Sequence, residues 1–182
     1  MDPNNNTPPL KRVRYFSGKL LTAEDLEAEQ RYLREKMKRH NRHLHGSGVV
    51  FGLEVGIVDR KVHVSPGFAI DCTGEEIAVP EALSIDPPEG QKAAFLMIAY
   101  QERKTDPLPL TGGHADDTMM PSRIEETFEL RYETDDPYAG HKGDDAMWVP
   151  CNQPHALPLA KLFHRWDTWE IDPWFEPPSI PH

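Results

Sequence analysis

The chain of 182 residues has only two cysteines, Cys72 and Cys151, which lie far apart and outside any CxxC pattern. This scarcity excludes a disulfide-rich scaffold and the spacing of a zinc ribbon. No apolar run approaches the roughly 20 residues of a transmembrane helix. The first nine residues, MDPNNNTPP, are polar and lack the apolar stretch of a secretory signal. We therefore expect cytoplasmic synthesis without a signal peptide, and no membrane insertion.

The common signatures of catalysis are also missing: the sequence contains no GxSxG, GxxxxGK[ST], GxGxxG or HExxH. His40, His43 and His45 follow one another at spacings of three and two, whereas a helical metal pair needs a spacing of four. Cys151 and His155 flank a proline-containing stretch with no evident carboxylate to orient the histidine. We predict that the protein is not an enzyme and holds no cofactor or metal.

Two acidic stretches that also contain histidine leave one further alternative open, a metal-dependent hydrolase. Neither stretch has the alternating acids, central glycine and terminal glutamate of a calcium-binding EF-hand loop. Solvated loop acids are the interpretation that we favour. The residues are His114, Asp116 and Asp117 in the first stretch, and Asp135, Asp136, His141, Asp144 and Asp145 in the second.

Charge is present in excess but is unevenly distributed. The net charge is −10, yet residues 1–45 carry ten Lys/Arg against six Asp/Glu, and residues 46–182 carry ten against twenty-four. An acidic protein does not suit nucleic acid, because neutralising phosphates needs clustered cations. The basic N-terminal part can dock on an acidic partner or on the acidic part of a neighbouring copy. Alternatively, its charges only solvate an exposed helix face.

A long helix is predicted over residues 22–45. Thr22 is a suitable N-cap, the first turn is acidic and the last turns are basic, as the helix dipole favours. Gly46 and Gly48 end the helix. The apolar side chains and one histidine recur at spacings of seven, four, three and four, which places them on one stripe; they are Leu26, Leu33, Met37, His40 and Leu44.

From Val49 onward the apolar periodicity changes to two, and glycine and proline punctuate short runs. Residues 93–101 form the most hydrophobic segment and are predicted to be a central buried strand. Residues 157–163 are predicted to form a last edge strand, and residues 13–21 an extended segment against the core. Residues 105–126 and 133–155 are predicted to be long connectors, which usually carry function or an assembly contact.

The predicted fold class is therefore α+β: a long amphipathic N-terminal helix followed by a small antiparallel β-sandwich or barrel-like module with long loops. The predicted organisation is an extended arm (1–21), a long basic helix (22–45), an antiparallel β domain with two long loops (46–165), and a Trp/Pro-rich tail (166–182).

Candidate partner-binding residues come from the basic helix and from the aromatic tail. The tail has too many large apolar side chains to leave in water, so they either cover the β module, contact a protein partner, or stack on a ligand such as a sugar. The eight candidates are Arg34, Lys38, Arg39, Arg42, Trp166, Trp169, Trp174 and Phe175.

Three stretches carry a resemblance to a known family: RYFSGKLLTAEDLEAEQRYLREK, HNRHLHGSGVVFGLEV and VHVSPGFAIDCTGEEIAVP. They resemble baseplate- or fibre-associated structural proteins of phage-tail-like particles, the extracellular contractile injection systems. The resemblance is specific between Tyr15 and Pro80, weaker beyond, and supplies no catalytic residues. It implies a non-enzymatic assembly component at the baseplate, fibre or cap of a particle that can be released from the cell.

The expected partners are other particle subunits and further copies of the chain, with no small-molecule ligand. The glycines at positions 46, 48, 52, 67 and 74 agree with a shape-determining role, because each stands at a predicted helix end, bulge or turn. The alternative to an assembly component is a module whose long loops bind a glycan or another surface ligand.

Overall fold

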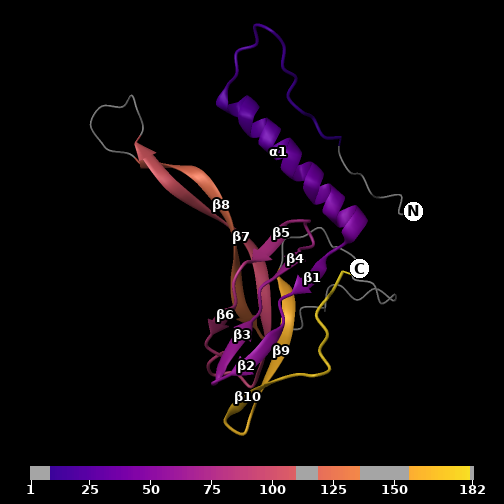
Figure 1. The fold of residues 1–182 in the computed structure, drawn as a ribbon, viewed down its shortest axis with the longest axis vertical. Helices are drawn as coiled ribbons and strands as arrows, with labels where there is room; N and C mark the ends of the chain where they lie inside the picture. The colour runs from indigo at the N-terminus through magenta and orange to yellow at the C-terminus, as the bar shows by residue number, and fades with distance from the viewer. Residues whose placement is uncertain (1–8, 110–118, 136–155, 181–182) are drawn as a thin grey trace.

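The computed structural model describes residues 9–109, 119–135 and 156–180. One α-helix precedes an antiparallel β module (Figure 1), so the predicted α+β class is confirmed. The helix α1 spans Ala23–His40 and continues into a π-helical turn, Asn41–His45. The strands are β1 (Gly48–Gly52), β2 (Val55–Val58), β3 (Lys61–Val64), β4 (Gly67–Ile70), β5 (Glu76–Val79), β6 (Leu83–Ile85), β7 (Ala93–Pro109), β8 (Met119–Glu133), β9 (Leu157–Arg165) and β10 (Thr168–Ile171).

The strands form three antiparallel sheets, with the orders β1-β4-β5, β2-β3-β6 and β10-β9-β7-β8. Together they curl as an open half-barrel, so the structure does not confirm a two-layer sandwich. All three sheets contribute side chains to one core, among them Val62 from β3, Ile77 from β5 and Leu96 from β7. The predicted central strand is confirmed: β7 lies between β9 and β8, and residues 94–98 are buried.

Local sequence explains where the helix begins and ends. Thr22 accepts a hydrogen bond from the backbone N–H of Asp25 at 3.3 Å, as an N-cap should. Gly46 has a φ of 86°, which a glycine adopts without strain, and its N–H donates to the carbonyl of Asn41 at 2.9 Å. The predicted boundaries therefore hold, except that the last five residues form a π-helical turn.

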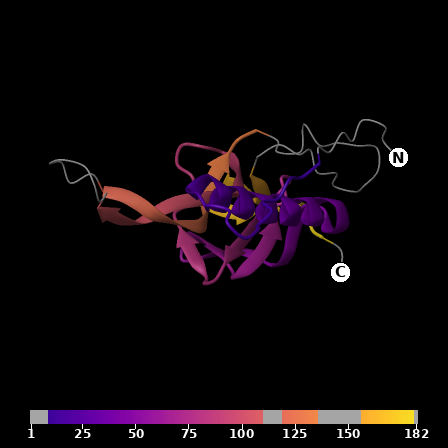
Figure 2. The same cartoon turned by 90° about the horizontal axis from the view of Figure 1, so that it is seen from above.

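Three sequence-based predictions were wrong. Residues 105–109 and 119–126 are not a connector, because they continue β7 and β8 as a two-stranded ribbon that projects from the module (Figures 1 and 2). The last predicted strand is not at an edge, because β9 lies between β10 and β7. Most of residues 13–21 are exposed rather than packed on the core. Charged residues and prolines obscure the strand pattern of these segments in the sequence. The two strands pair with each other and do not pack on the core.

Close backbone contacts explain two glycines of the β module. A Cβ on Gly52 would lie 2.0 Å from the carbonyl oxygen of Pro66, and one on Gly67 would lie 2.4 Å from that of Phe51. These distances are far inside van der Waals contact, so the β1–β4 pairing requires glycine at both positions. The predicted structural role of these glycines is confirmed.

Candidate interaction surfaces

The predicted basic docking residues of the helix contact the chain's own β module. Lys38 Nζ lies 2.9 Å from Glu75 Oε1. Arg34 Nη2 lies 3.3 Å from the same Glu75 oxygen and 2.5 Å from Glu102 Oε1 on β7. These cations therefore hold the helix over an acidic part of the same chain. The basic N-terminal part of the sequence thus contacts the acidic remainder within one monomer.

The remaining two basic candidates lie at the same junction. Arg42 Nη1 donates to the carbonyl of Thr73 at 3.0 Å. Arg39 is half-buried in the last turn of α1. All four basic candidates thus come together at the C-terminal half of the helix.

Sequence reasoning missed Asn41, a buried polar residue of this junction that is only 4% exposed. Its side-chain amide donates to the carbonyl of Gly74 at 3.0 Å and to Glu76 Oε1 at 3.1 Å. The available signal was a lone asparagine among basic residues, directly after His40 of the stripe. A buried amide with two acceptors fixes the end of the helix on the β4–β5 turn.

That turn is itself organised by a buried carboxylate. Asp71 Oδ1 accepts hydrogen bonds from the backbone N–H and hydroxyl of Thr73, both at 2.8 Å, and from the N–H of Glu75 at 2.9 Å. Gly74 has a φ of 87°, and a Cβ there would lie 2.3 Å from the carbonyl oxygen of Lys38. The turn therefore packs backbone against backbone on the helix, and Asp71 orients Glu75 toward the two cations.

The predicted apolar stripe of the helix lies on a different face from these docking residues, and its side chains are not packed on the β module. Its four apolar side chains remain largely exposed to solvent: Leu26 at 52%, Leu33 at 59%, Met37 at 53% and Leu44 at 70%. The structure does not confirm an amphipathic helix of the usual kind, because the face toward the module is polar. The apolar face remains without a partner within the described residues.

The aromatic candidates of the tail divide into an inward and an outward pair. Trp169 on β10 packs against the main core, with its ring centroid 5.1 Å from that of His164. Phe175 packs edge-to-face on Phe95 at 5.6 Å. Trp166 and Trp174 are 94% and 90% exposed. Two of the four aromatic side chains therefore complete the module, and two stand in solvent.

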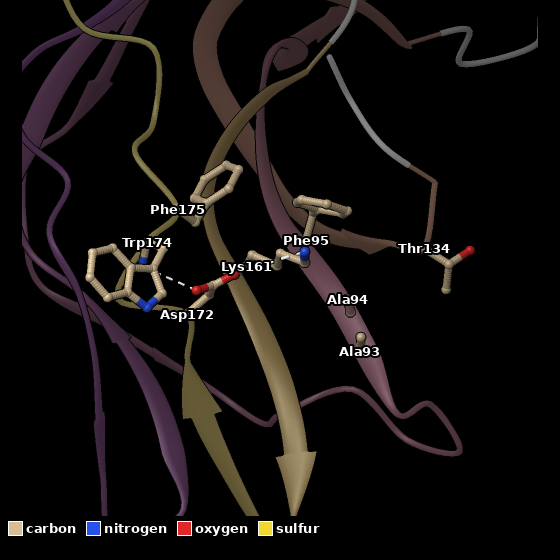
Figure 3. A pocket seen from close by; sticks show the side chains of 8 residues that line it. All are labelled: Ala93, Ala94, Phe95, Thr134, Lys161, Asp172, Trp174 and Phe175. Atoms are coloured by element: carbon tan, nitrogen blue, oxygen red, sulfur yellow. Dashed lines mark hydrogen bonds and ion pairs between the residues drawn. The ribbon is translucent and has the colours of Figure 1, made fainter. Parts of the chain in front are cut away.

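A shallow groove of about 460 Å³ opens beside Trp174 (Figure 3). Phe95, Trp174 and Phe175 line it together with a cation and a carboxylate, Lys161 Nζ and Asp172 Oδ2, which lie 3.8 Å apart. The backbone N–H of Trp174 donates to Asp172 Oδ1 at 3.0 Å, which holds the main chain of Trp174 at the rim. The groove offers aromatic surface next to a neutralised ion pair, an arrangement suited to binding rather than to proton transfer.

The ribbon of β7 and β8 provides another apolar surface that no other described element covers. Leu108, Met119, Met120 and Ile124 are each at least half exposed on it. In this part of the chain β8 is the outer strand, and β9 covers β7 only as far as Ile98. A two-stranded ribbon is marginally stable alone in water, and the apolar side chains of this one are exposed.

Nearly all residues of the acidic stretches that suggested a hydrolase lie outside the described residues, and so do Cys151 and His155. The residues of these stretches that lie outside are His114, Asp116, Asp117, Asp136, His141, Asp144 and Asp145. Across residues 9–109, 119–135 and 156–180, no three His, Cys, Asp or Glu side chains are grouped as metal ligands would be. In the same residues, no helix has the length and apolar character needed to cross a membrane.

No protein-family model matches this chain, and no curated protein matches it. Its fold is similar to solved structures of the type VI secretion system. In each of three matches, 94% of this chain is aligned. The matched structures are a chain of the TssK-TssF-TssG baseplate subcomplex (TM-score 0.52, 14% identity), TssK in a crystal structure (TM-score 0.56, 13% identity), and a chain of the baseplate complex (TM-score 0.53, 13% identity). This chain spans 62%, 42% and 60% of those chains.

Proposed function

We propose that this protein is a non-enzymatic structural subunit of the baseplate region of a phage-tail-like contractile particle. The observation that carries the proposal is the similarity of its fold, over 94% of its length, to chains of type VI secretion baseplate structures. At these identities the similarity shows a shared fold, and the role in a particle is our inference from it. The similarity agrees with the family resemblance of the sequence.

The distribution of apolar surface supports an assembly role. The helix stripe, the ribbon and the two outward tryptophans are separate surfaces that a free monomer leaves in water. Scattered single apolar residues need no explanation, but grouped ones mark contacts with other proteins. A subunit that touches several neighbours needs several such surfaces, and a free enzyme does not.

Particle purification tests the proposal. Sheathed particles isolated from the source cells are expected to contain this chain, detected by mass spectrometry at a fixed ratio to the sheath protein. Replacing Leu108 and Met120 on the ribbon together by lysine should abolish incorporation, because these side chains would otherwise be desolvated against a neighbour. Val58→Lys, an equally exposed change on β2, should leave incorporation intact. Particles that contain none of the protein would refute the proposal.

The groove beside Trp174 favours a second candidate function, the binding of a glycan or another surface ligand. An exposed indole at the rim of a groove can stack on the apolar face of a sugar ring. Glycan-array binding by the purified chain that disappears in Trp174→Ala, but persists in Trp166→Ala, would support it. An array without signal would eliminate this function and leave the assembly proposal untouched.

A further inference from the structure

The exposed stripe of α1 has the spacing of a coiled-coil seam. Including one glutamine and one histidine, its positions alternate at four and three residues, which is the pattern of a and d positions in a heptad. They are Leu26, Gln30, Leu33, Met37, His40 and Leu44. A surface helix that only has to be solvated does not need this order, whereas a helix that packs along another helix does.

The stripe is accessible because the helix is fixed to the module by other residues. Arg34, Lys38 and Asn41 make the contacts with the acidic turn and with β7. These residues lie on the flank of the helix, and the stripe is directed away from them. The N-terminal half of α1 rises away from the strands of the β module (Figure 1), so a second helix can lie along the stripe without displacing a strand.

The charges along α1 indicate which helix fits. The acidic residues of its first half are Glu24, Asp25, Glu27 and Glu29, and the basic residues that follow are Arg31, Arg34, Lys36, Lys38 and Arg39. A parallel copy would pair Glu29 only with Arg34 of the partner subunit, which already contacts Glu75 and Glu102, and would leave Lys36 without an opposite charge. An antiparallel copy places the acidic half against the basic half, and it also aligns the two helix dipoles favourably. We propose that α1 pairs with α1 of a second copy as an antiparallel, two-fold coiled coil.

The length of the regular helix sets the register. Antiparallel pairing of Ala23 with His40 places the whole α-helical segment within the pair, before the π-helical turn changes the phase. In this register Leu26 meets Met37 of the partner subunit, and every layer occurs twice. At the flanking positions, Glu29 faces Lys36 of the partner subunit. Two oppositely charged pairs thus border the seam, which fixes the register as well as the direction.

The expected affinity is modest. Eighteen helical residues give a seam of about 27 Å, which buries less than the roughly 800 Å² per partner of a standard interface. Dissociation constants in the micromolar range or weaker are therefore expected for the isolated pair. The pairing does not depend on the proposed function, since it concerns two copies of this chain alone.

Sedimentation equilibrium of the full chain at low salt, up to about 200 µM to cover that affinity range, tests the pairing. The wild type should approach a dimer with rising concentration, and Leu33→Lys should weaken association at least about tenfold, because it buries a charge in the seam. Val58→Lys, at 54% exposure against 59% for Leu33, is the matched control and should associate like the wild type. A wild type that stays monomeric, a trimer, or a Leu33→Lys variant that still dimerises would overturn the proposal.

A charge exchange tests direction and register. Glu29→Lys and Lys36→Glu should each weaken dimerisation about three- to tenfold, and the double exchange should restore it, because the pairs are re-formed with reversed sign. Glu29 also accepts a hydrogen bond from Tyr15, so Tyr15→Phe controls for the loss of that contact. In a parallel pair Lys36 faces Asn41 of the partner subunit and Lys36→Glu would change nothing. In an antiparallel pair shifted by one heptad Lys36 would face its own copy, and Lys36→Glu would strengthen it. Either result would overturn the proposal.

Discussion

Replacing Asn41 by alanine should release the end of the helix from the β module. The variant removes the hydrogen bond from the Asn41 amide to the Gly74 carbonyl, together with the bond to Glu76. Gly74 is buried, so its carbonyl loses a partner that water cannot fully replace. Glu76 is exposed, and water substitutes there at little cost.

The magnitude follows from these two environments. An unsatisfied buried acceptor costs about 1–3 kcal/mol, and the exposed bond adds a few tenths at most. For a chain of this size each kcal/mol lowers the melting temperature by about 2–4 °C. We therefore expect Asn41→Ala to lower the melting temperature by roughly 2–12 °C.

Thermal unfolding followed by far-UV circular dichroism measures this change. His43→Ala is the matched control, since His43 is exposed in the same π-helical turn and should change the stability by less than about 0.5 kcal/mol. The reasoning is refuted if Asn41→Ala melts within about 1 °C of that control. Such a result would mean that the buried amide contributes nothing to helix docking.

Three further predictions concern other contacts. Gly74→Ala should destabilise the chain by about 1–3 kcal/mol, measured by urea unfolding, because its φ of 87° is strained for alanine and a Cβ would lie 2.3 Å from a helix carbonyl. The hydrogen bond from Lys19 lowers the pKa of Asp25, so the pair stabilises the fold above the ordinary carboxyl pKa and is lost as pH falls through the lowered one. In Lys19→Ala the NMR-titrated pKa of Asp25 should return toward its ordinary value, and an unchanged pKa would contradict this assignment. Trp169→Ala should cost about 2–4 kcal/mol in the same urea experiment, whereas Trp166→Ala should fall within about 0.5 kcal/mol of the wild type.

Much of the fold follows from local sequence signals. Thr22 and Gly46 bound the helix as expected, because capping depends on residues adjacent in the chain. The Asp59–Arg60 pair forms the β2–β3 turn with φ values of 50° and 64°, which is a local property as well. The buried part of β7 could be predicted from the sequence because a strand that is covered on both faces has to be continuously apolar.

Which surfaces are covered and which are exposed could not be predicted from the sequence, because this depends on contacts between residues that are distant in the chain. The apolar stripe was correctly located, but its exposure follows from Arg34 and Lys38 reaching Glu75, which is about forty residues away in sequence. Periodicity identifies a face and does not say what covers it. The ribbon was missed for a similar reason. Its strands are held by the pairing of β7 with β8 and do not show the alternating apolar residues of a strand that packs on a core.

The C-terminal segment has a consequence for how the chain acquires its structure. Val49, at the start of the β module, donates to the carbonyl of Pro178 at 2.7 Å and accepts from the N–H of Ile180 at 2.9 Å. Contacts between residues so far apart in sequence form late, because closing the intervening loop costs entropy before they give any return. During synthesis β1 therefore cannot form its hydrogen bonds with this segment until residues 178–180 have left the ribosome. Nascent chains that have not yet released these residues present β1 with one edge open.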